Sequence, residues 1–437
     1  MTDDGDDGVG GEGDAPSTTV RDAAGDTDAE PEFDTLAPTA VASGRATDAY
    51  FQRTEAALAH ADVNPHVVAE VTADQFPDGD FELFAGLGAA VDLFAGLAVD
   101  VDAMAEGRLF DGGPVMRIEG PYRAFARYET SLLGLVSHAS GMATAALECR
   151  RAAPNSQVLS FGARHVHPAV APTVERSALV GGLDGFSHVA AGDVIDREAG
   201  GTMPHALPIC FGPGEQEAAW RAFDEAVAES VPRIALCDTY SDEVDEVLRA
   251  VETLGDRLDG VRLDTTGSRR GDFRHICREV RWELEARGRG DVSVFVSGGL
   301  GPADLRELRD VVDGFGVGGY VSNADPVDFA LDIVAVDGEL VAKRGKLSGA
   351  KSVYRTADGG HHVGLADRDG PDDGEELLRP VIRDGAVVAD FPLGADAVEP
   401  ASEAAAAERD AIDAAAERAL ADAVAVGFGV DGGGTDD

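Results

Sequence analysis

The hydrophobic pattern over residues 45–130 is mixed. The stretches "TDAYFQRTEAALAHA" and "FELFAGLGAAVDLFAGL" have the apolar spacing of helices, and "GRLFDGGPVMRIEGPY" predicts a β-hairpin that turns around Asp111, Gly112 and Gly113. Helices combined with a hairpin are typical of an α+β arrangement. We therefore predict an α+β domain over residues 41–130.

From about residue 130 onwards, amphipathic helices alternate with short apolar strands. The helices include "EQEAAWRAFDEAVAES", "DEVDEVLRAVETL" and "HICREVRWELEARG", and the strands are "QVLSFG", "ALVGGLDGF", "RIALCDTY", "GVRLDTT", "VSVFVSGG" and "GFGVGGYV". Buried strands that alternate with helices form parallel sheets. So many units favour an α/β barrel over an open sheet, and we predict such a barrel over residues 131–335.

The two ends of the chain have a different composition. Residues 1–40 and 426–437 are dominated by Asp, Gly, Glu, Thr and Pro, which bury too little apolar surface to offset the entropy of folding. We predict that both are disordered tails. The Ala-rich stretch over residues 401–425 predicts a peripheral helix.

The net charge of the chain is −45, with 81 acidic and 36 basic residues. Such a charge repels nucleic acid and anionic membranes. Because the acidity runs through the whole chain, we interpret it as adaptation to a high-salt cytosol, and an acidic interaction surface is the alternative. We find no apolar run long enough to span a membrane and no signal-peptide pattern, so we expect a cytoplasmic protein.

Polar residues and glycines follow the predicted strands at the ends where barrel enzymes carry their catalytic groups. In chain order these residues are Phe161, Arg164, Asp184, Ser187, Asp238, Asp264, Arg269, Arg270, Gly298, Gly299, Gly318 and Gly319. The two glycine pairs would let backbone N–H groups approach a phosphate, although plain turns would also use glycine.

The remaining strand-end residues suggest a ligand with a sugar and a planar ring. Asp238 and Asp264 could hold sugar hydroxyls or Mg²⁺, or they could cap the helices that follow them. Phe161 and Arg164 offer an aromatic face and a flat cation, unless the arginine is structural. His205 in "GTMPHALP" is a candidate base or phosphoryl acceptor, with a structural role as the alternative.

The chain has only three lysines, and all of them lie in "AKRGKLSGAK". This basic cluster, which contains Lys343, Lys346 and Lys351, could bind phosphate, face an acidic partner subunit or form a solvated loop. His165 and His167 lack a carboxylate at metal-ligand spacing, so we predict no protein metal site there.

Many motifs in order resemble the nicotinate phosphoribosyltransferase family, in particular its archaeal branch. They extend from about Thr47 to Tyr354 and include "TDAYFQRT", "IEGPYRAFARYETSLLGLVSHASGMAT", "FGARHVHPAVAP", "GGLDGFSHVAAG", "GTMPHAL", "RLDTTGSRRGDF", "VSGGL", "FGVGGYVSNADPVDF" and "KRGKLSG". The resemblance implies a barrel of the quinolinate phosphoribosyltransferase type. It also implies that residues 336–400 return to complete the N-terminal domain.

The resemblance further implies the reaction and the assembly. Nicotinate and phosphoribosyl pyrophosphate would give nicotinate mononucleotide and pyrophosphate, with coupled ATP hydrolysis and Mg²⁺, as the entry step of NAD salvage. The active sites would be shared between the subunits of a homodimer or a larger homo-oligomer.

Residue roles follow from the matching motifs. Phe161 and Arg164 would sandwich the pyridine ring, Asp184 would lie near its acyl group, and His205 would accept phosphate from ATP. The other implied contacts are ribose and phosphate at Arg262 and Asp264, the 5′-phosphate at Gly298, Gly299, Gly318 and Gly319, and a partner-supplied Tyr50. We treat Arg269 and Arg270 as further phosphate or pyrophosphate contacts, or as ion pairs.

The sequence departs from the family pattern in two places. Paired cysteines often follow the "KRGKxSGxK" motif in archaeal relatives, but "VYRTADGGHHVGLADRDG" has none, so we expect no zinc despite His361 and His362. A threonine is common where Gly319 stands. The alternatives to the nicotinate reaction are nicotinamide or quinolinate as substrate and, much less favoured, a ligand-sensing barrel without turnover.

Overall fold

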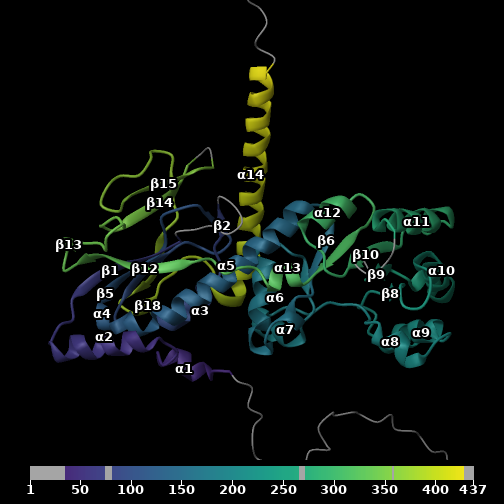
Figure 1. The fold of residues 1–437 in the computed structure, drawn as a ribbon, viewed down its shortest axis with the longest axis horizontal. Coiled ribbons are helices and arrows are strands. Elements are labelled where there is room, and N and C mark those ends of the chain that lie inside the picture. The colour runs from purple at the N-terminus through teal and green to yellow at the C-terminus, as the bar shows by residue number, and fades with distance from the viewer. Residues whose placement is uncertain (1–34, 74–80, 265–270, 357–358, 428–437) are drawn as a thin grey trace, which may run out of the picture. The chain divides into compact units, whose positions relative to one another are not determined.

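One sheet of the computed structural model combines strands from early and late in the chain (Figure 1). The model describes residues 35–73, 81–264, 271–356 and 359–427, with side chains described up to residue 413. All elements named below belong to the unit formed by residues 38–437. This antiparallel sheet has the order β13 (Glu339–Leu340), β12 (Phe329–Val336), β1 (His66–Ala73), β5 (Pro114–Pro121), β3 (Asp100–Ala103), β17 (Arg379–Arg383) and β18 (Ala386–Val387).

Alternating burial explains why β1 lies in the middle of this sheet. Val67, Ala69, Val71 and Ala73 are buried, as the two-residue period of a strand requires. The helix α2 (Ala49–His60) confirms the first helix predicted in this region. The second is confirmed only over α3 (Leu87–Phe94), because residues 82 and 83 of the predicted helix form a strand. Val353, in β14 (Lys351–Arg355), also packs into this apolar core. β14 lies between β15 (His361–Leu365) and β16 (Glu375–Glu376) in a smaller sheet.

The predicted hairpin around Asp111–Gly113 is wrong. The strands β4 (Leu109–Phe110) and β5 flank this turn, but β4 pairs with β2 (Glu82–Leu83), whereas β5 lies between β1 and β3. The apolar side chains explain the separation. Leu83 and Leu109 pack against α5, whereas Val115 and Ile118 enter the core of the larger sheet.

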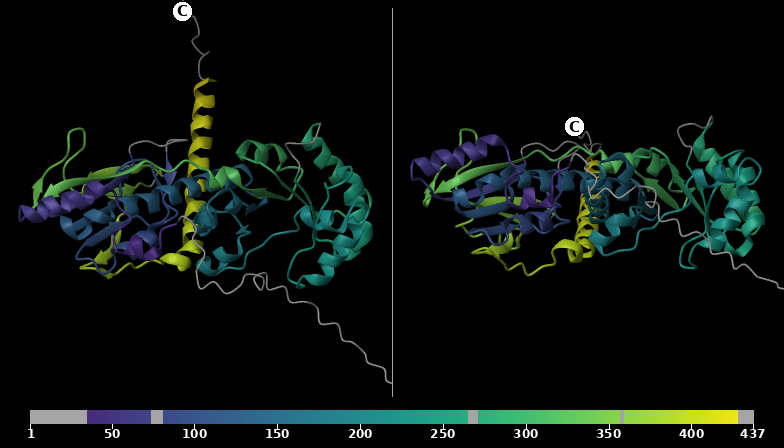
Figure 2. Two further views of the ribbon diagram at one scale, coloured as in Figure 1. Left: turned by 60° about the horizontal axis from the view of Figure 1, so that its bottom comes forward. Right: turned by 90° about the horizontal axis from the view of Figure 1, so that it is seen from below.

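Residues 157–317 form the predicted parallel sheet. Its hydrogen-bonded order is β7 (Gly185–Phe186), β6 (Gln157–Ser160), β11 (Gly314–Val317), β10 (Ser293–Ser297), β9 (Gly260–Leu263) and β8 (Ile234–Leu236). The intervening helices include α6 (Ala171–Val180), α9 (Gln216–Ala226), α10 (Glu243–Leu254), α11 (Phe273–Ala286) and α12 (Pro302–Leu308). The views in Figure 2 show α9, α10 and α11 gathered beside β8 and β9. These elements confirm the mixed α/β fold.

Two details of this sheet differ from the prediction. The predicted strand "ALVGGLDGF" begins too early, because Ala178–Val180 form the last turn of α6. Gly181 fits against the backbone of Ala143, and Gly182 has a left-handed φ of 92°, so these glycines end the helix. β7 is consequently only two residues long. Within the described residues, β7 and the three-residue β8 are edge strands, and no hydrogen bonds between them close the barrel.

Two long helices, α5 and α14, pack against several other elements of the fold. α5 (Glu129–Ala152) packs against β2 and β12 as well as α6, α12 and α13 (Gly319–Ser322). The predicted Ala-rich helix is confirmed as α14 (Val398–Gly427), and its first turns pack against α5 and α6. Most of the two predicted tails lies outside the described residues. The short helix α1 (Pro38–Ala42) shows that the first of them was extended too far. Among the described residues, no helix is long and apolar enough to cross a membrane.

Candidate active site

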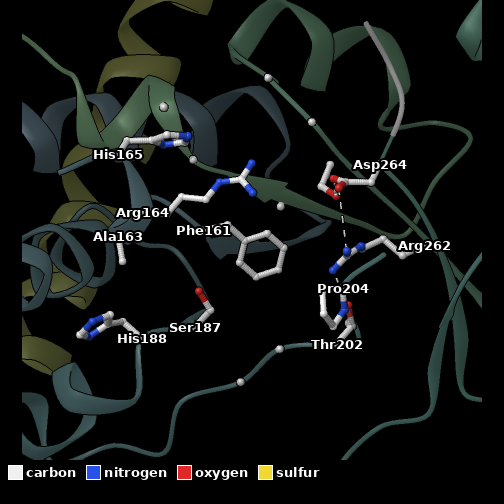
Figure 3. A pocket seen from close by; sticks show the side chains of 18 of the residues that line it. Phe161, Ala163, Arg164, His165, Ser187, His188, Thr202, Pro204, Arg262 and Asp264 are labelled. Carbon is white, nitrogen blue, oxygen red and sulfur yellow. Dashed lines mark hydrogen bonds and ion pairs between the residues drawn. The ribbon is translucent and has the colours of Figure 1, made fainter. Parts of the chain in front are cut away.

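A cavity of about 920 Å³ lies at the C-terminal ends of the parallel strands (Figure 3). Because parallel strands end at the same edge of a sheet, residues from distant parts of the sequence meet there. Nine of the predicted site residues line this cavity: Phe161, Arg164, Ser187, Arg262, Asp264, Gly298, Gly299, Gly318 and Gly319. The geometry therefore brings most of the predicted site together.

Two arginines lie around an aromatic ring in this cavity. Phe161 follows β6 directly, and the guanidinium carbon of Arg262 is 6.0 Å from the centre of its ring. Arg164 reaches the same space from the short 3-10 helix Ala163–His165 and makes no ion pair within the described residues. Figure 3 shows both guanidinium groups directed toward the space around the ring. A planar anion fits such a combination of apolar face and positive charge.

Arg262 is only partly satisfied by the protein. One of its terminal nitrogens donates to Thr202, and the other lies 4.0 Å from Asp264 Oδ2. Its Nε is buried and has no hydrogen-bond partner among the described residues. Burial lowers the pKa of the guanidinium, and nearby Arg164 lowers it further, although Asp264 and Asp238 oppose both effects. A buried cation with an unused donor is a favourable place for an anionic ligand.

Three residues form a hydrogen-bonded network beside the cavity. Asp238 Oδ1 lies 2.9 Å from Nε2 of His205, and its Oδ2 accepts a hydrogen bond of 2.6 Å from the backbone N–H of Asp264. Nδ1 of His205 lies 3.8 Å from Asp264 Oδ2. Ser297 donates to the other oxygen of Asp264. This arrangement fixes the imidazole between two carboxylates.

The network changes the role expected for Asp238. Its side chain is only 1% exposed and does not line the cavity. The helix-cap alternative is also wrong, because Asp242 caps α10 by accepting from Val244 N–H. Asp238 therefore orients His205 and Asp264 and does not face the cavity itself.

The glycines leave room along one side of the cavity. Gly298 and Gly299 have φ angles of 105° and 74°, a region that other residues rarely adopt. A Cβ at Gly316 would lie 2.4 Å from the Phe161 ring, so only glycine lets that ring lie over the end of β11. Gly318 lies against the imidazole of His165, which also lines the cavity.

Asp184 is not brought to the cavity, contrary to the prediction. It immediately precedes β7, where it pairs with Arg150 and accepts a hydrogen bond of 2.6 Å from Val158 N–H. The cavity lies at the other end of these strands, where Ser187 follows β7. The physical reason is the shortness of β7, which begins only after Asp184.

For three further residues that were predicted in the site, the structure gives no contact with the cavity. Tyr50 lies on α2, is 57% exposed and donates a hydrogen bond of 3.2 Å to Asp48. Its supply to a partner subunit stays a prediction. Arg269 and Arg270 lie outside the described residues.

The lysines of the basic cluster pair with acids of their own chain. Lys343 and Lys346 lie 2.6 and 3.3 Å from the carboxylate oxygens of the buried Asp332. Lys351 lies 2.7 Å from Glu70, which is 1% exposed. The loop is mostly exposed to solvent, as one of the alternatives predicts, but its lysines also form ion pairs with the fold.

Sequence reasoning missed several residues that shape the cavity. Ser297 is the last residue of β10. It could have been found if the search for polar residues after each predicted strand had also included the last residue of the strand. Gly316 lies inside a strand, and Thr202 lies in a segment without regular periodicity. Their roles depend on contacts with Phe161 and Arg262 that no local pattern predicts.

Two family models match consecutive parts of the chain. Residues 48–140 match the quinolinate phosphoribosyl transferase N-terminal domain, and residues 142–332 match the C-terminal domain of the same family. The boundary between these matches lies within α5.

Individual proteins resemble the chain over longer stretches. Nicotinate phosphoribosyltransferase pncB2 of Mycobacterium tuberculosis is 30% identical over 73% of this chain and 72% of its own length. For pncB1 of the same species the values are 31%, 66% and 64%, so the chain spans less than two thirds of that relative.

A solved structure extends this similarity to nearly the whole of a related chain. The crystal structure of nicotinate-nucleotide pyrophosphorylase from Pyrococcus furiosus is 45% identical, has a TM-score of 0.83 and covers 88% of this chain and 99% of its own. The matched domains, the relatives and the solved structure agree. The chain belongs to the nicotinate phosphoribosyltransferase family, with domains of the quinolinate phosphoribosyltransferase type.

Proposed function

We propose that this protein transfers the phosphoribosyl group of phosphoribosyl pyrophosphate to nicotinate. The products would be nicotinate mononucleotide and pyrophosphate, in cytoplasmic NAD salvage. The observation that carries the proposal is that Phe161, Arg164 and Arg262 line the same cavity as the two glycine pairs, with Arg262 beside the Phe161 ring. This cavity offers sites for a flat anionic ring and for a phosphate, and the names of the relatives in Mycobacterium tuberculosis agree with it.

Each substrate group has a matching part of the cavity. The pyridine ring would stack on Phe161, and its carboxylate would meet the guanidinium group of Arg164 or of Arg262. The backbone of Gly298–Gly299 and Gly318–Gly319 would hold the 5′-phosphate, because glycine allows close approach to an anion. Asp264 would hold the ribose.

The reaction needs positioning more than it needs a protein nucleophile. The ring nitrogen attacks C1 of the ribose while the bond from C1 to the pyrophosphate oxygen breaks, and the electron pair of that bond leaves with pyrophosphate. C1 becomes positively charged on the way, so a nearby carboxylate such as Asp264 stabilises it. Holding ring and ribose in line supplies much of the remaining acceleration.

His205 is the proposed acceptor of a phosphoryl group from ATP. Asp238 binds Nε2, and Nδ1 has no hydrogen bond within the described residues. Nδ1 is therefore the atom that would form the bond to phosphorus. Phosphorylation would place negative charge beside Asp264. ATP hydrolysis would thereby change the electrostatic field at the substrate site.

Mg²⁺ would enter with its substrates. No group of three or more His, Cys, Asp or Glu residues that could hold a metal occurs in the described ranges. Mg²⁺ commonly binds through one or two carboxylates together with phosphate oxygens, and Asp264 is the cavity carboxylate suited to this. The ion would neutralise charge on the pyrophosphate.

Quinolinate is the second candidate substrate. Both family models bear its name, and the similar Pyrococcus furiosus structure is called a nicotinate-nucleotide pyrophosphorylase. Quinolinate carries a second carboxylate, whose binding would call for more positive charge than nicotinate needs. Arg164 and Arg262 are the arginines that line the cavity within the described residues, which favours the monocarboxylate.

A substrate comparison tests the proposal. Purified protein in concentrated KCl would receive phosphoribosyl pyrophosphate and Mg²⁺ with nicotinate, nicotinamide or quinolinate, with and without ATP. We expect formation of nicotinate mononucleotide from nicotinate, stimulated by ATP. Product from quinolinate or nicotinamide but not from nicotinate would exclude the proposed substrate.

The role of His205 has its own test. We expect His205→Ala to remove the stimulation by ATP and to leave slow, ATP-independent synthesis, because the ring and phosphate sites are intact. His275→Ala is a matched control, since His275 lies on α11 and its imidazole pairs with Asp272 away from the cavity lining. Survival of ATP stimulation in the His205 variant would contradict phosphorylation at this residue.

Assembly is a separate proposal. We expect a homodimer or a larger homo-oligomer in which Tyr50 of one subunit completes the cavity of another. Its exposed position on α2 and its distance in sequence from the cavity residues support this arrangement. Mixing a Tyr50→Ala variant with an Arg262→Ala variant should restore part of the activity through hybrid sites.

A further inference from the structure

A histidine lies directly beside the second glycine pair of the cavity. His165 ends the 3-10 helix Ala163–His165 and lines the cavity, and Figure 3 shows its imidazole next to Arg164. A Cβ added to Gly318 would lie 3.1 Å from Cε1 of this ring, and one added to Gly319 would lie 3.7 Å from both Cε1 and Nδ1. An anion held by the backbone of these glycines would therefore lie close to the imidazole.

One nitrogen of this imidazole already has a partner. Nδ1 of His165 lies 3.4 Å from Oγ of Ser322, and the hydroxyl of Ser322 donates to the carbonyl oxygen of Gly318 at 3.3 Å. Because the only hydroxyl proton points to Gly318, the oxygen of Ser322 can accept but not donate toward Nδ1. The proton of a neutral imidazole therefore belongs on Nδ1.

The other nitrogen, Nε2, is left for a ligand. It makes no hydrogen bond within the described residues, and the side chain of His165 is exposed. With its single proton on Nδ1, a neutral ring could offer a phosphate only the lone pair of Nε2, which repels an anion. An imidazolium has a proton on both nitrogens and would donate a charge-assisted hydrogen bond.

We propose that His165 binds the 5′-phosphate of phosphoribosyl pyrophosphate through Nε2, and that it does so only as the imidazolium. This inference rests on the proposed function of the cavity. It adds a side-chain cation to a phosphate site that otherwise consists of glycine backbone. When the ring is neutral before binding, water supplies the proton, and no covalent bond of the substrate changes.

The surroundings of His165 do not neutralise such a charge. Within the described part of the chain, no carboxylate pairs with it. The elements packed against its 3-10 helix are α6, α13 and the 3-10 helix Pro168–Val170. The charged or titratable side chains on or beside these elements and in the cavity lining are Arg164, His167, Glu175, Arg176, His188, Arg262, Asp264 and Tyr320.

One of these groups calls for a control. Arg176 and Tyr320 pair with the acids Glu106 and Glu148. Burial raises the pKa of Glu175 to about 7, so its carboxyl group titrates in the same pH range as an ordinary histidine. The variant Glu175→Gln removes this titration and leaves His165 in place.

The first test measures substrate affinity against pH. Because the phosphate would bind only the protonated ring, binding should be strongest at low pH and weaken as the ring loses its proton. We expect the wild-type KM for phosphoribosyl pyrophosphate to rise by about tenfold between pH 6 and pH 8.5, the range of one charge-assisted hydrogen bond. Glu175→Gln should show the same rise.

Variants of His165 separate charge from shape. We expect His165→Ala to raise this KM by about tenfold at pH 6 and by less than about threefold at pH 8.5, with the KM for nicotinate unchanged. His165→Arg carries its charge at both pH values and should keep the KM low at both. His167→Ala is the matched control, because His167 does not line the cavity and its Nδ1 accepts from the backbone N–H of Ala169.

Calorimetry distinguishes the 5′-phosphate from the pyrophosphate of the same substrate. Ribose 5-phosphate and magnesium pyrophosphate would be titrated separately into wild type and His165→Ala at pH 7.5, in two buffers that differ in ionisation enthalpy. We expect ribose 5-phosphate to bring up to about one more proton into wild type than into the variant. Pyrophosphate should show no such difference. A difference with pyrophosphate alone would assign His165 to the leaving group and overturn the proposal.

Two kinetic results would also overturn it. One is a KM for phosphoribosyl pyrophosphate that rises with pH in His165→Ala as it does in wild type. The other is an equal increase in the KM of both substrates at pH 6, which would indicate a general disturbance of the cavity. If wild type converts nicotinate and gives one of these results, only this inference fails. If wild type does not convert nicotinate, the proposed function fails and takes the inference with it.

Discussion

Two regions of this acidic protein gather positive charge, and they use it differently. The cavity has Arg164 and Arg262 at the ends of parallel strands, whereas the basic cluster has Lys343, Lys346 and Lys351 near the antiparallel sheet. Both regions stand out in a chain of net charge −45. Sequence alone offers phosphate binding as an explanation for each.

The difference lies in how far the protein itself satisfies each cation. The ammonium group of Lys351 contacts Glu70 and two backbone carbonyl oxygens, of Leu347 and Gly349, at 2.7–3.0 Å. Arg262 keeps a buried Nε without a partner, and no ion pair involves Arg164 in the described part of the chain. A cation whose donors are all used stabilises the fold, whereas a cation with donors left over can bind a ligand.

The largest effect should follow from removing Arg262. We expect Arg262→Ala to lower kcat/KM by about 10³-fold, which corresponds to about 4 kcal/mol of transition-state stabilisation. Arg257→Ala is the matched control, because the exposed Arg257 pairs with the partly buried Asp224 away from the cavity lining. Steady-state kinetics with both substrates varied would measure the loss. Activity within about tenfold of wild type would remove Arg262 from the substrate site.

The next effect concerns Lys351 and should appear in stability. Lys351→Met leaves Glu70 buried without its cation, and we expect the free energy of unfolding to fall by about 3 kcal/mol, with kcat/KM unchanged. Denaturant titration would measure the fall. The double variant Glu70→Gln/Lys351→Met should recover part of it, since no charge remains buried. A large kinetic defect without a loss of stability would place Lys351 among the ligand contacts instead.

The same contrast explains how much the sequence could predict. The alternation of helices and strands located the parallel sheet. The search for polar residues after each predicted strand located Phe161, Arg164 and Asp264, because an apolar strand that ends at the cavity is followed directly in sequence by the residues that line it. The search failed at Asp184, since the strand there is shorter than its apolar run and starts after that residue.

Tertiary contacts account for what remained hidden. Asp238 lies at a strand end as expected, but only its contacts with His205 and Asp264 show that it points away from the cavity. Glu175 lies in an amphipathic helix, where a glutamate is ordinarily exposed. Whether a charged side chain is paired or left with unused donors depends on partners far away in sequence, which periodicity does not encode.

The smallest expected effect should follow from adding a hydrogen-bond donor to the cavity at Gly319. Gly319 begins α13, and an added Cβ would lie 3.3 Å from the amide nitrogen of Asn323, the movable end of a side chain, so a small residue fits. Gly319→Ser adds a hydroxyl donor at the proposed 5′-phosphate site. We expect the KM for phosphoribosyl pyrophosphate to fall by about 2–10-fold, the range of one net hydrogen bond. Gly319→Ala adds the same Cβ without the hydroxyl and should leave this KM unchanged. Equal KM values for the two variants would indicate that phosphate does not bind at this glycine pair, and unused donors would then matter only at the ring end of the cavity.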